Sequence, residues 1–177
     1  MSLKPKFWNA DKIVSFSAIL ISLATMAIYL YQTHLIQKQQ HASVMPYLRM
    51  GYSFYEDGFD YNLSNEGLGP AFINEVNTYY KGKKYAHTDI ANFYLKTYIK
   101  IDTSITSANI YGINESTLMP AGNTIDLIWK HNNTELAPKL HKLFSSKDLI
   151  LEIKYSSIYG DKWVVKGVQV KPTKIED

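Results

Sequence analysis

Few residues in this 177-residue sequence have the type and spacing that enzyme or metal chemistry requires. There is no cysteine, which excludes thiol catalysis, disulfide bridges and cysteine-ligated metals. The five histidines form no H-E-x-x-H or H-x-H pattern, and there is no G-x-S-x-G nucleophile turn. The acids around Gly58 lack the alternate spacing of a calcium loop. We therefore expect no enzyme activity, no metal and no cofactor.

The segment N-E-G-L-G-P-A contains two closely spaced glycines that resemble a phosphate-binding loop. A nucleotide loop would continue with Lys-Ser/Thr or with a third glycine that opens a helix, whereas Pro70 follows here. We interpret the segment as a structural corner between two strands, formed by Asn65, Gly67, Gly69 and Pro70. The glycines allow positive φ, and the proline fixes its own φ and lacks a hydrogen-bond donor.

Tyrosines that alternate with lysines are the pattern best suited to binding. Such residues can bind glycans, single-stranded nucleic acid or proteins, but tyrosine also favours half-buried strand positions, and the second interpretation is favoured. The pattern comprises Tyr79, Tyr80, Tyr85, Tyr94, Tyr98, Tyr155 and Tyr159 with Lys81, Lys83, Lys84, Lys96 and Lys154.

The net charge of +3 lies entirely at the N-terminal end of the chain. Four lysines and one aspartate precede Val44, and the remaining sequence has 15 basic and 15 acidic residues. A neutral domain has no electrostatic footprint for a nucleic acid, so we expect no nucleic-acid partner.

Residues 13–31 are apolar and contain no charged residue. As a helix they would span about 28 Å, close to the hydrocarbon thickness of a bilayer. Tyr29 and Tyr31 flank one end, as in an aromatic belt. A cleaved signal peptide is the alternative, but apolarity continues through Leu30 and favours a signal anchor. The lipid bilayer is therefore an expected partner.

The distribution of lysines predicts the orientation of this helix. Lys4, Lys6 and Lys12 precede it, and Lys38 alone follows before Arg49. The positive-inside rule places the N-terminus in the cytoplasm and the rest of the chain in the periplasm or outside the cell. We predict a single-pass protein of the cell (inner) membrane, and the opposite orientation remains an alternative.

Small and weakly polar residues recur along one face of the predicted membrane helix. Ser15, Ala18, Ser22 and Thr25 follow one another at spacings of three, four and three. Such small residues let helix backbones approach closely, so we predict self-association through this face. The alternative is that the hydroxyls bond back to their own helix.

Beyond the membrane helix the periodicity changes to two, which indicates strands. The predicted organisation is a cytoplasmic segment 1–12, a transmembrane helix 13–31, a helical stalk 32–45, a β-sandwich domain 46–172 and a tail 173–177. The expected strands cover residues 47–54, 59–64, 71–79, 104–111, 124–130, 149–155 and 163–170. Residues 88–100 are predicted as a helix in preference to a strand, and a short helix buries Leu136, Leu140, Leu143 and Phe144. The predicted fold is mainly β: an antiparallel β-sandwich with one or two inserted short helices, preceded by a transmembrane helix.

Three motifs resemble those of a group of bacterial proteins with one N-terminal membrane helix followed by a β-sandwich. They are the corner at residues 65–71, a P-x-G turn at residues 120–122, and a hairpin at residues 155–163 that reads Y-S-S-I-Y-G-D-K-W. The resemblance covers most of residues 47–170. It implies the architecture and a bacterial origin, and it implies no activity.

Two functions are consistent with these expectations. The favoured one is a non-catalytic, membrane-anchored β-sandwich that recognises a protein or an envelope ligand. The alternative is a membrane effector or sensor, in stress or phage defence, whose soluble domain senses a signal and controls association of the membrane helices. The orientation of the chain distinguishes the two.

Overall fold

The computed structural model describes residues 9–86, 113–130, 132, 134–146, 148–168 and 171–176. The chain divides into two compact units, residues 1–42 and 43–177. The first unit contains one helix, α1 (Ala10–Ser43), of 34 residues, none of which is buried. At about 1.5 Å per residue it is about 51 Å long. It is long and apolar enough to cross a membrane, and it continues without a break through the segment predicted as a stalk.

The second unit is mainly β, and every pairing among the described strands is antiparallel. A three-stranded sheet has the order β1-β2-β6, formed by β1 (Leu48–Phe54), β2 (Phe59–Asn65) and β6 (Thr124–Lys130). The β1–β2 hairpin was predicted from alternation, and its full register runs from Leu48↔Asn65 to Phe54↔Phe59.

A six-stranded sheet has the order β4-β3-β7-β8-β9, and β5 also pairs with β3. Its strands are β3 (Ala71–Tyr80), β4 (Lys83–Ala86), β5 (Leu118–Met119), β7 (Leu149–Ser156), β8 (Lys162–Lys166) and β9 (Thr173–Ile175). The β3–β4 turn has positive φ at Lys81 and Gly82, the pattern that matches the twist of a two-residue hairpin loop.

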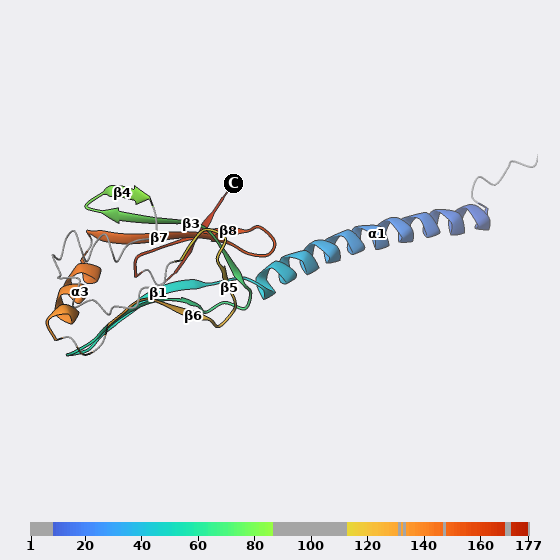
Figure 1. Cartoon of the computed structure of the whole chain (residues 1–177). Coiled ribbons are helices and arrows are strands. Elements are labelled where there is room, and N and C mark those ends of the chain that lie inside the picture. Colours follow the sequence, from blue (N-terminus) through green and yellow to red (C-terminus); the bar gives the residue numbers. More distant parts are fainter. Residues whose placement is uncertain are drawn as a thin grey trace, which may run out of the picture. The chain divides into compact units, whose positions relative to one another are not determined.

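The two sheets share one apolar core, and Figure 1 shows them as two layers. Tyr155 of β7 stacks on Trp163 of β8 with ring centroids 5.8 Å apart, and both are buried. The Tyr155 hydroxyl accepts a hydrogen bond from the Leu48 backbone N–H of the other sheet at 3.3 Å. Burial raises the pKa of this phenol to about 12, so it stays neutral and suited to its buried position.

Helix α3 (Leu136–Ser145) contacts β1, β2 and β7. Leu136, Leu140 and Phe144 are buried on one face as predicted, whereas Leu143, which was also expected to be buried, is only partly buried. The Phe144 ring lies 4.6 Å from that of Tyr61, centroid to centroid. On the same helix, His141 stacks on Phe54 of β1 at 4.4 Å, so α3 is held to the three-stranded sheet by aromatic contacts.

Several expectations differ from the structure. The segment predicted as a polar tail contains β9, which pairs with β8. Leu127 and Ile128 are adjacent in β6 and both are buried, because a bulge opposite Tyr61 and Asn62 interrupts the alternation that is ordinary in a strand. A second bulge interrupts β3 between Ile73 and Glu75. The helix predicted at residues 88–100 and the strand predicted at residues 104–111 lie outside the described residues.

Candidate functional site

The predicted corner is organised around the side chain of Asn65, which is 1% exposed. Its Nδ2 donates to the carbonyls of Gly69 at 2.9 Å, Met119 at 3.1 Å and Pro120 at 3.2 Å. Its Oδ1 accepts from the backbone N–H groups of Tyr47 and Gly67, both at 3.1 Å. Both ends of the amide are therefore satisfied, as a buried side chain of this kind requires.

The backbone extends the same set of contacts. The Glu66 N–H donates to Tyr47 O at 2.8 Å, and the Leu68 N–H donates to Met45 O at 3.1 Å. On the other side, Asn65 exchanges two backbone hydrogen bonds of 2.9 Å with the turn at Gly122 and Asn123. The corner therefore ties the chain that enters the domain to the turn before β6.

The reason for glycine at this corner differs from the expected one. Neither Gly67 nor Gly69 lies in the positive-φ region. Instead, a Cβ at Gly67 would overlap the backbone of Met45 and Tyr47, and a Cβ at Gly69 would lie 2.9 Å from Val44 Cα and overlap the Val44 carbonyl. The glycines permit close approach of two backbone segments. Pro70 is half-buried and directly precedes β3.

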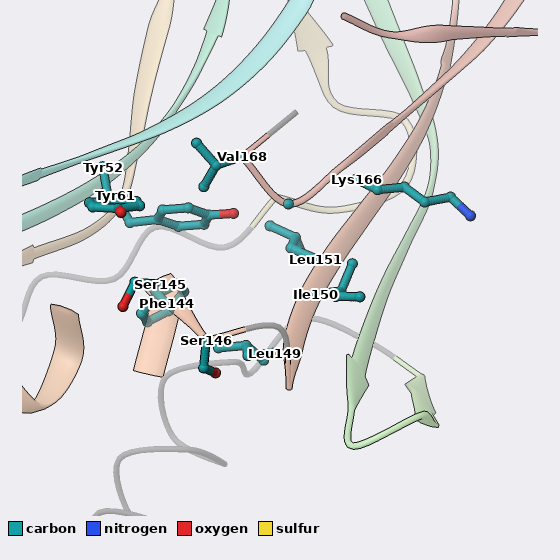
Figure 2. Close-up of a pocket in the computed structure, with 11 residues that line it drawn as sticks. Tyr52, Tyr61, Phe144, Ser145, Ser146, Leu149, Ile150, Leu151, Lys166 and Val168 are labelled. Carbon is teal, nitrogen blue, oxygen red and sulfur yellow. The ribbon is translucent and has the colours of Figure 1, made fainter. Parts of the chain in front are cut away.

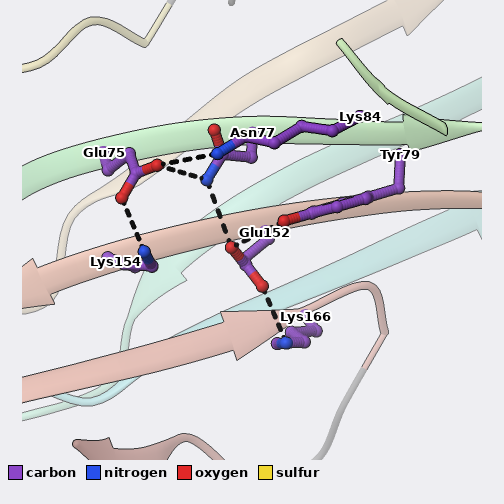
Figure 3. Close-up of polar contacts among 7 residues, drawn as sticks. All are labelled: Glu75, Asn77, Tyr79, Lys84, Glu152, Lys154 and Lys166. Atoms are coloured by element: carbon purple, nitrogen blue, oxygen red, sulfur yellow. Dashed lines mark hydrogen bonds and ion pairs between the residues drawn. The ribbon is translucent and has the colours of Figure 1, made fainter. Parts of the chain in front are cut away.

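A network of charged and polar side chains crosses one face of the six-stranded sheet (Figure 3). Glu75 binds Lys154 at 2.6 Å through Oε2, and it binds Lys84 at 3.1 Å and the Asn77 amide at 2.7 Å through Oε1. The Asn77 amide also donates to Glu152 at 3.2 Å. These residues face one another because the register pairs Asn77 with Glu152 and Glu75 with Lys154.

Glu152 is the buried member of this network. Its side chain is 6% exposed, and its Oε2 binds Lys166 Nζ at 2.7 Å. The Tyr79 hydroxyl donates to its other oxygen at 3.4 Å. Burial opposes the charge, but the hydrogen bonds from Lys166 and Asn77 outweigh burial and lower the pKa of Glu152.

The pKa of Glu75 is lowered further, to about 2, by hydrogen bonds from Lys154, Asn77 and Lys84. Both carboxylates are therefore ionised near neutral pH. A general acid needs a raised pKa so that it retains its proton. The network consequently acts as a set of ion pairs across β3, β4, β7 and β8 and is not suited to proton donation.

A cavity of about 400 Å³ lies between the two sheets beside the C-terminal end of α3. Figure 2 shows its lining, which comes from the central part of the β1–β2 hairpin, the end of α3, the start of β7 and the end of β8. The lining residues are Tyr52, Tyr61, Phe144, Ser145, Ser146, Leu149, Ile150, Leu151, Lys166, Gly167 and Val168. Val168 and Ile150 are 48% and 36% exposed, so the cavity meets solvent on their side.

The polar groups of this lining are largely engaged elsewhere. The hydroxyls of Ser145 and Ser146 donate to the helix carbonyls of His141 at 2.6 Å and Leu143 at 2.7 Å. Lys166 points away from the cavity in Figure 2 and binds Glu152. The Tyr61 hydroxyl donates to Met50 Sδ at 3.3 Å. The lining is therefore mainly apolar; its phenols are that of Tyr61, which is weakly paired, and that of the half-buried Tyr52.

The predicted helix-association residues lie on α1, and their hydroxyls bond back to the same helix. Ser15 donates to Asp11 O at 2.8 Å, Ser22 to Ala18 O at 2.9 Å, and Thr25 to Ile21 O at 2.8 Å. Their protons are thus used within the helix. Any contribution of this face to association would come from its small size and close packing.

The structure brings some of the tyrosines and lysines that alternate in the sequence together: Tyr79 pairs with Lys84 between β3 and β4, and Lys81 Nζ lies 5.5 Å from the centroid of the Tyr80 ring. Tyr155 is buried in the core, whereas Tyr159 is exposed in the β7–β8 turn. Lys154 and Lys84 belong to the polar network. Tyr94, Tyr98 and Lys96 lie outside the described residues.

The described residues contain no group of three or more histidine and acidic side chains that could hold a metal ion. Sequence analysis missed both the polar network and the cavity, because their members come from segments far apart in the chain. No protein-family model matches the chain, and no curated protein matches it.

The glycine contacts lead to a prediction about stability. Gly69→Ala is expected to lower the free energy of unfolding by about 2 kcal/mol or more, because backbone overlap cannot be relieved by a rotamer change. Gly51→Ala is the matched control, since its Cβ would lie 3.4 Å from Asn62 Oδ1, and it should change stability by less than about 0.5 kcal/mol. Urea unfolding of the full chain in detergent micelles, followed by near-ultraviolet circular dichroism, measures both. Equal stability of the two variants would contradict the close-approach argument.

The polar network leads to a prediction about pH. Because the folded pKa of Glu75 is about 2, against an ordinary value of 4.5, its ion pairs stabilise the fold fully above about pH 4.5. This stabilisation is lost as the pH falls from 4.5 towards 2. In this range of pH, Glu75→Gln should make the free energy of unfolding depend less steeply on pH. The decrease in slope should correspond to the uptake of less than one proton on unfolding. Glu56→Gln, in an exposed turn, should leave it unchanged, and equal slopes for all three proteins would refute the assignment.

Proposed function

We propose that this protein is a non-catalytic recognition protein of a bacterial cell membrane. In this proposal α1 crosses the inner membrane, and the β domain, a β-sandwich, lies in the periplasm or outside the cell. The domain binds an apolar envelope ligand in the cavity beside Tyr61, Phe144 and Leu151. The cavity is the observation that carries the proposal, because it is apolar and about 400 Å³ in volume.

The dimensions and lining of the cavity support a ligand. Binding sites for small molecules are typically about 300–1,000 Å³ and are lined by apolar and aromatic side chains with few polar groups. Tyr52, Tyr61 and Phe144 supply aromatic surface here, and Leu149 and Leu151 supply aliphatic surface. Ordered water needs about three hydrogen-bond partners, and few of the described lining side chains have a polar group that is not already hydrogen-bonded. An apolar molecule is therefore the more favourable occupant.

The properties of α1 support attachment to a membrane. A soluble helix of this length would bury an apolar face, whereas α1 buries no residue. Attachment would hold the domain at the bilayer surface, where a raised local concentration makes weak binding sufficient. An envelope ligand of low solubility in water would be found at the same surface.

The charged groups support recognition in preference to catalysis. Glu75 and Glu152 are the described carboxylates with the most extensive side-chain contacts, and each is ion-paired with lysine. The cavity itself contains no carboxylate among its lining residues. Acid–base catalysis would need a titratable group within hydrogen-bonding reach of a bound substrate.

Ligand binding can be tested with a neutral probe, 4-phenylbutan-1-ol. We expect the full chain in lipid nanodiscs to bind one molecule of this alcohol, measured by calorimetry after subtraction of the signal from empty nanodiscs. Val168→Phe should weaken binding by about tenfold or more, because the larger side chain would occupy the cavity. Val168 is half-exposed, so the substitution should be tolerated by the fold.

Leu118→Phe is the matched control for this experiment. Leu118 is also half-exposed, lies in β5 and does not line the cavity. The Leu118→Phe protein should bind the alcohol with the same affinity as the unsubstituted chain. Absence of binding in the unsubstituted chain, or equal weakening by both substitutions, would refute the cavity as the ligand site.

We also propose that copies of the protein associate through the small residues of α1. In a membrane-helix association reporter, Ala18→Ile combined with Ser22→Ile should reduce the signal at least threefold, since the larger side chains would prevent close approach of the helix backbones. Leu20→Ile is the control and should leave the signal unchanged. An unchanged signal in the double variant would exclude this face as the interface.

A further inference from the structure

We infer that the cavity selects a neutral ligand that has an apolar body and one hydrogen-bond acceptor, and that this acceptor meets the hydroxyl of Tyr61. The inference rests on the proposed function, since it assigns a chemical class to the ligand of the same cavity. Three features of the lining support it: the state of the Tyr61 hydroxyl, the position of the Lys166 charge, and the engagement of both serines.

Tyr61 supplies the polar contact. Its side chain is 2% exposed, yet among the described residues the only hydrogen-bond partner of its hydroxyl is Met50 Sδ at 3.3 Å. A thioether sulfur is a weak acceptor, so an alcohol, ether or carbonyl oxygen would be a better partner for this buried proton. Burial raises the pKa of the phenol, and the hydroxyl therefore keeps its proton.

An anionic ligand would lack a compensating charge in this cavity. Among the described lining residues Lys166 is the only charged one, and its ammonium binds Glu152 Oε2 at 2.7 Å (Figures 2 and 3). Asn77 and Tyr79 hold the same carboxylate in place. A buried carboxylate whose side-chain donors are only the phenols of Tyr52 and Tyr61 would lose most of its hydration without a compensating positive charge.

A cationic ligand fits less well than a neutral one for a related reason. An ammonium group has donors only, and it would therefore leave the Tyr61 proton with its weak sulfur partner. The hydroxyls of Ser145 and Ser146 are held against helix carbonyls at 2.6 and 2.7 Å. The rings of Tyr52, Tyr61 and Phe144 could attract a cation through their faces, so a cation is included as a competing outcome of the test.

The test compares three probes with one carbon skeleton, using the full chain in nanodiscs at pH 7. The probes are 4-phenylbutan-1-ol, which is neutral, 4-phenylbutyrate, which is anionic, and 4-phenylbutylamine, which is cationic. Calorimetry with empty nanodiscs as the reference gives each affinity. We expect the alcohol to bind at least about tenfold more tightly than either ion.

A substitution tests the role of Tyr61 separately. Tyr61→Phe should weaken binding of the alcohol about fivefold to tenfold, as expected for loss of one buried hydrogen bond. It should leave the affinity for butylbenzene, which has no acceptor, unchanged. If this variant does not fold, the comparison of the three probes still decides the ligand class on the unsubstituted chain.

The possible results separate this inference from the proposed function. If none of the four probes binds, the cavity is not a ligand site and the proposed function fails. If phenylbutyrate or phenylbutylamine binds as tightly as the alcohol, the cavity is a ligand site and the inference of a neutral ligand is overturned. If Tyr61→Phe weakens butylbenzene and the alcohol equally, Tyr61 contributes surface and not a hydrogen bond, which also overturns the inference.

Discussion

The Asn65 carboxamide is the interaction on which the arrangement of the β domain depends. It joins three separate pieces of chain: the segment that leads into β1, the glycine corner, and the turn before β6. Close approach of these backbones leaves no space for a Cβ at Gly67 or Gly69. A buried amide that satisfies donors and acceptors on both sides also specifies one arrangement, because a displaced partner would leave a polar group unpaired. The corner therefore fixes where β1 starts, and the register of the hairpin follows from it.

The same principle explains the chemical character of the cavity. Polar groups around it are each engaged by a nearby partner: the two serines by the helix carbonyls, and Lys166 by Glu152 on the outer face of the sheet. The ion pair with Glu152 thus holds the Lys166 ammonium on the outer face of the sheet. What remains on the inner side is apolar surface with the phenols of Tyr61 and Tyr52. The selectivity that we propose for the cavity is a consequence of interactions made outside it.

Sequence patterns predicted the elements that have a strong period and missed those that do not. The apolar helix, the β1–β2 hairpin and the buried face of α3 follow from spacing alone. The strands β5 and β9 have two and three residues, which are too few to show alternation. In β6 a bulge interrupts the alternation of buried and exposed residues that would otherwise mark the strand. The sequence identified the corner because its residues are contiguous, although the reason for the glycines was different. The cavity and the Glu75–Glu152 network could not be predicted, since both depend on strand register and on segments about 100 residues apart.

The corner also shows which part of the chain before β1 belongs to the β domain. Hydrogen bonds attach Met45 and Tyr47 to the domain, so these residues belong to its rigid part. The cavity is lined by Tyr52 and Tyr61, in the central part of the hairpin whose other end is the corner. A ligand-dependent signal to the helix would have to pass along this fully paired hairpin and through the tightly packed corner. A continuous hydrogen-bonded ladder resists such a change, and this constraint favours a domain that presents a fixed binding site over one that gates its membrane helix.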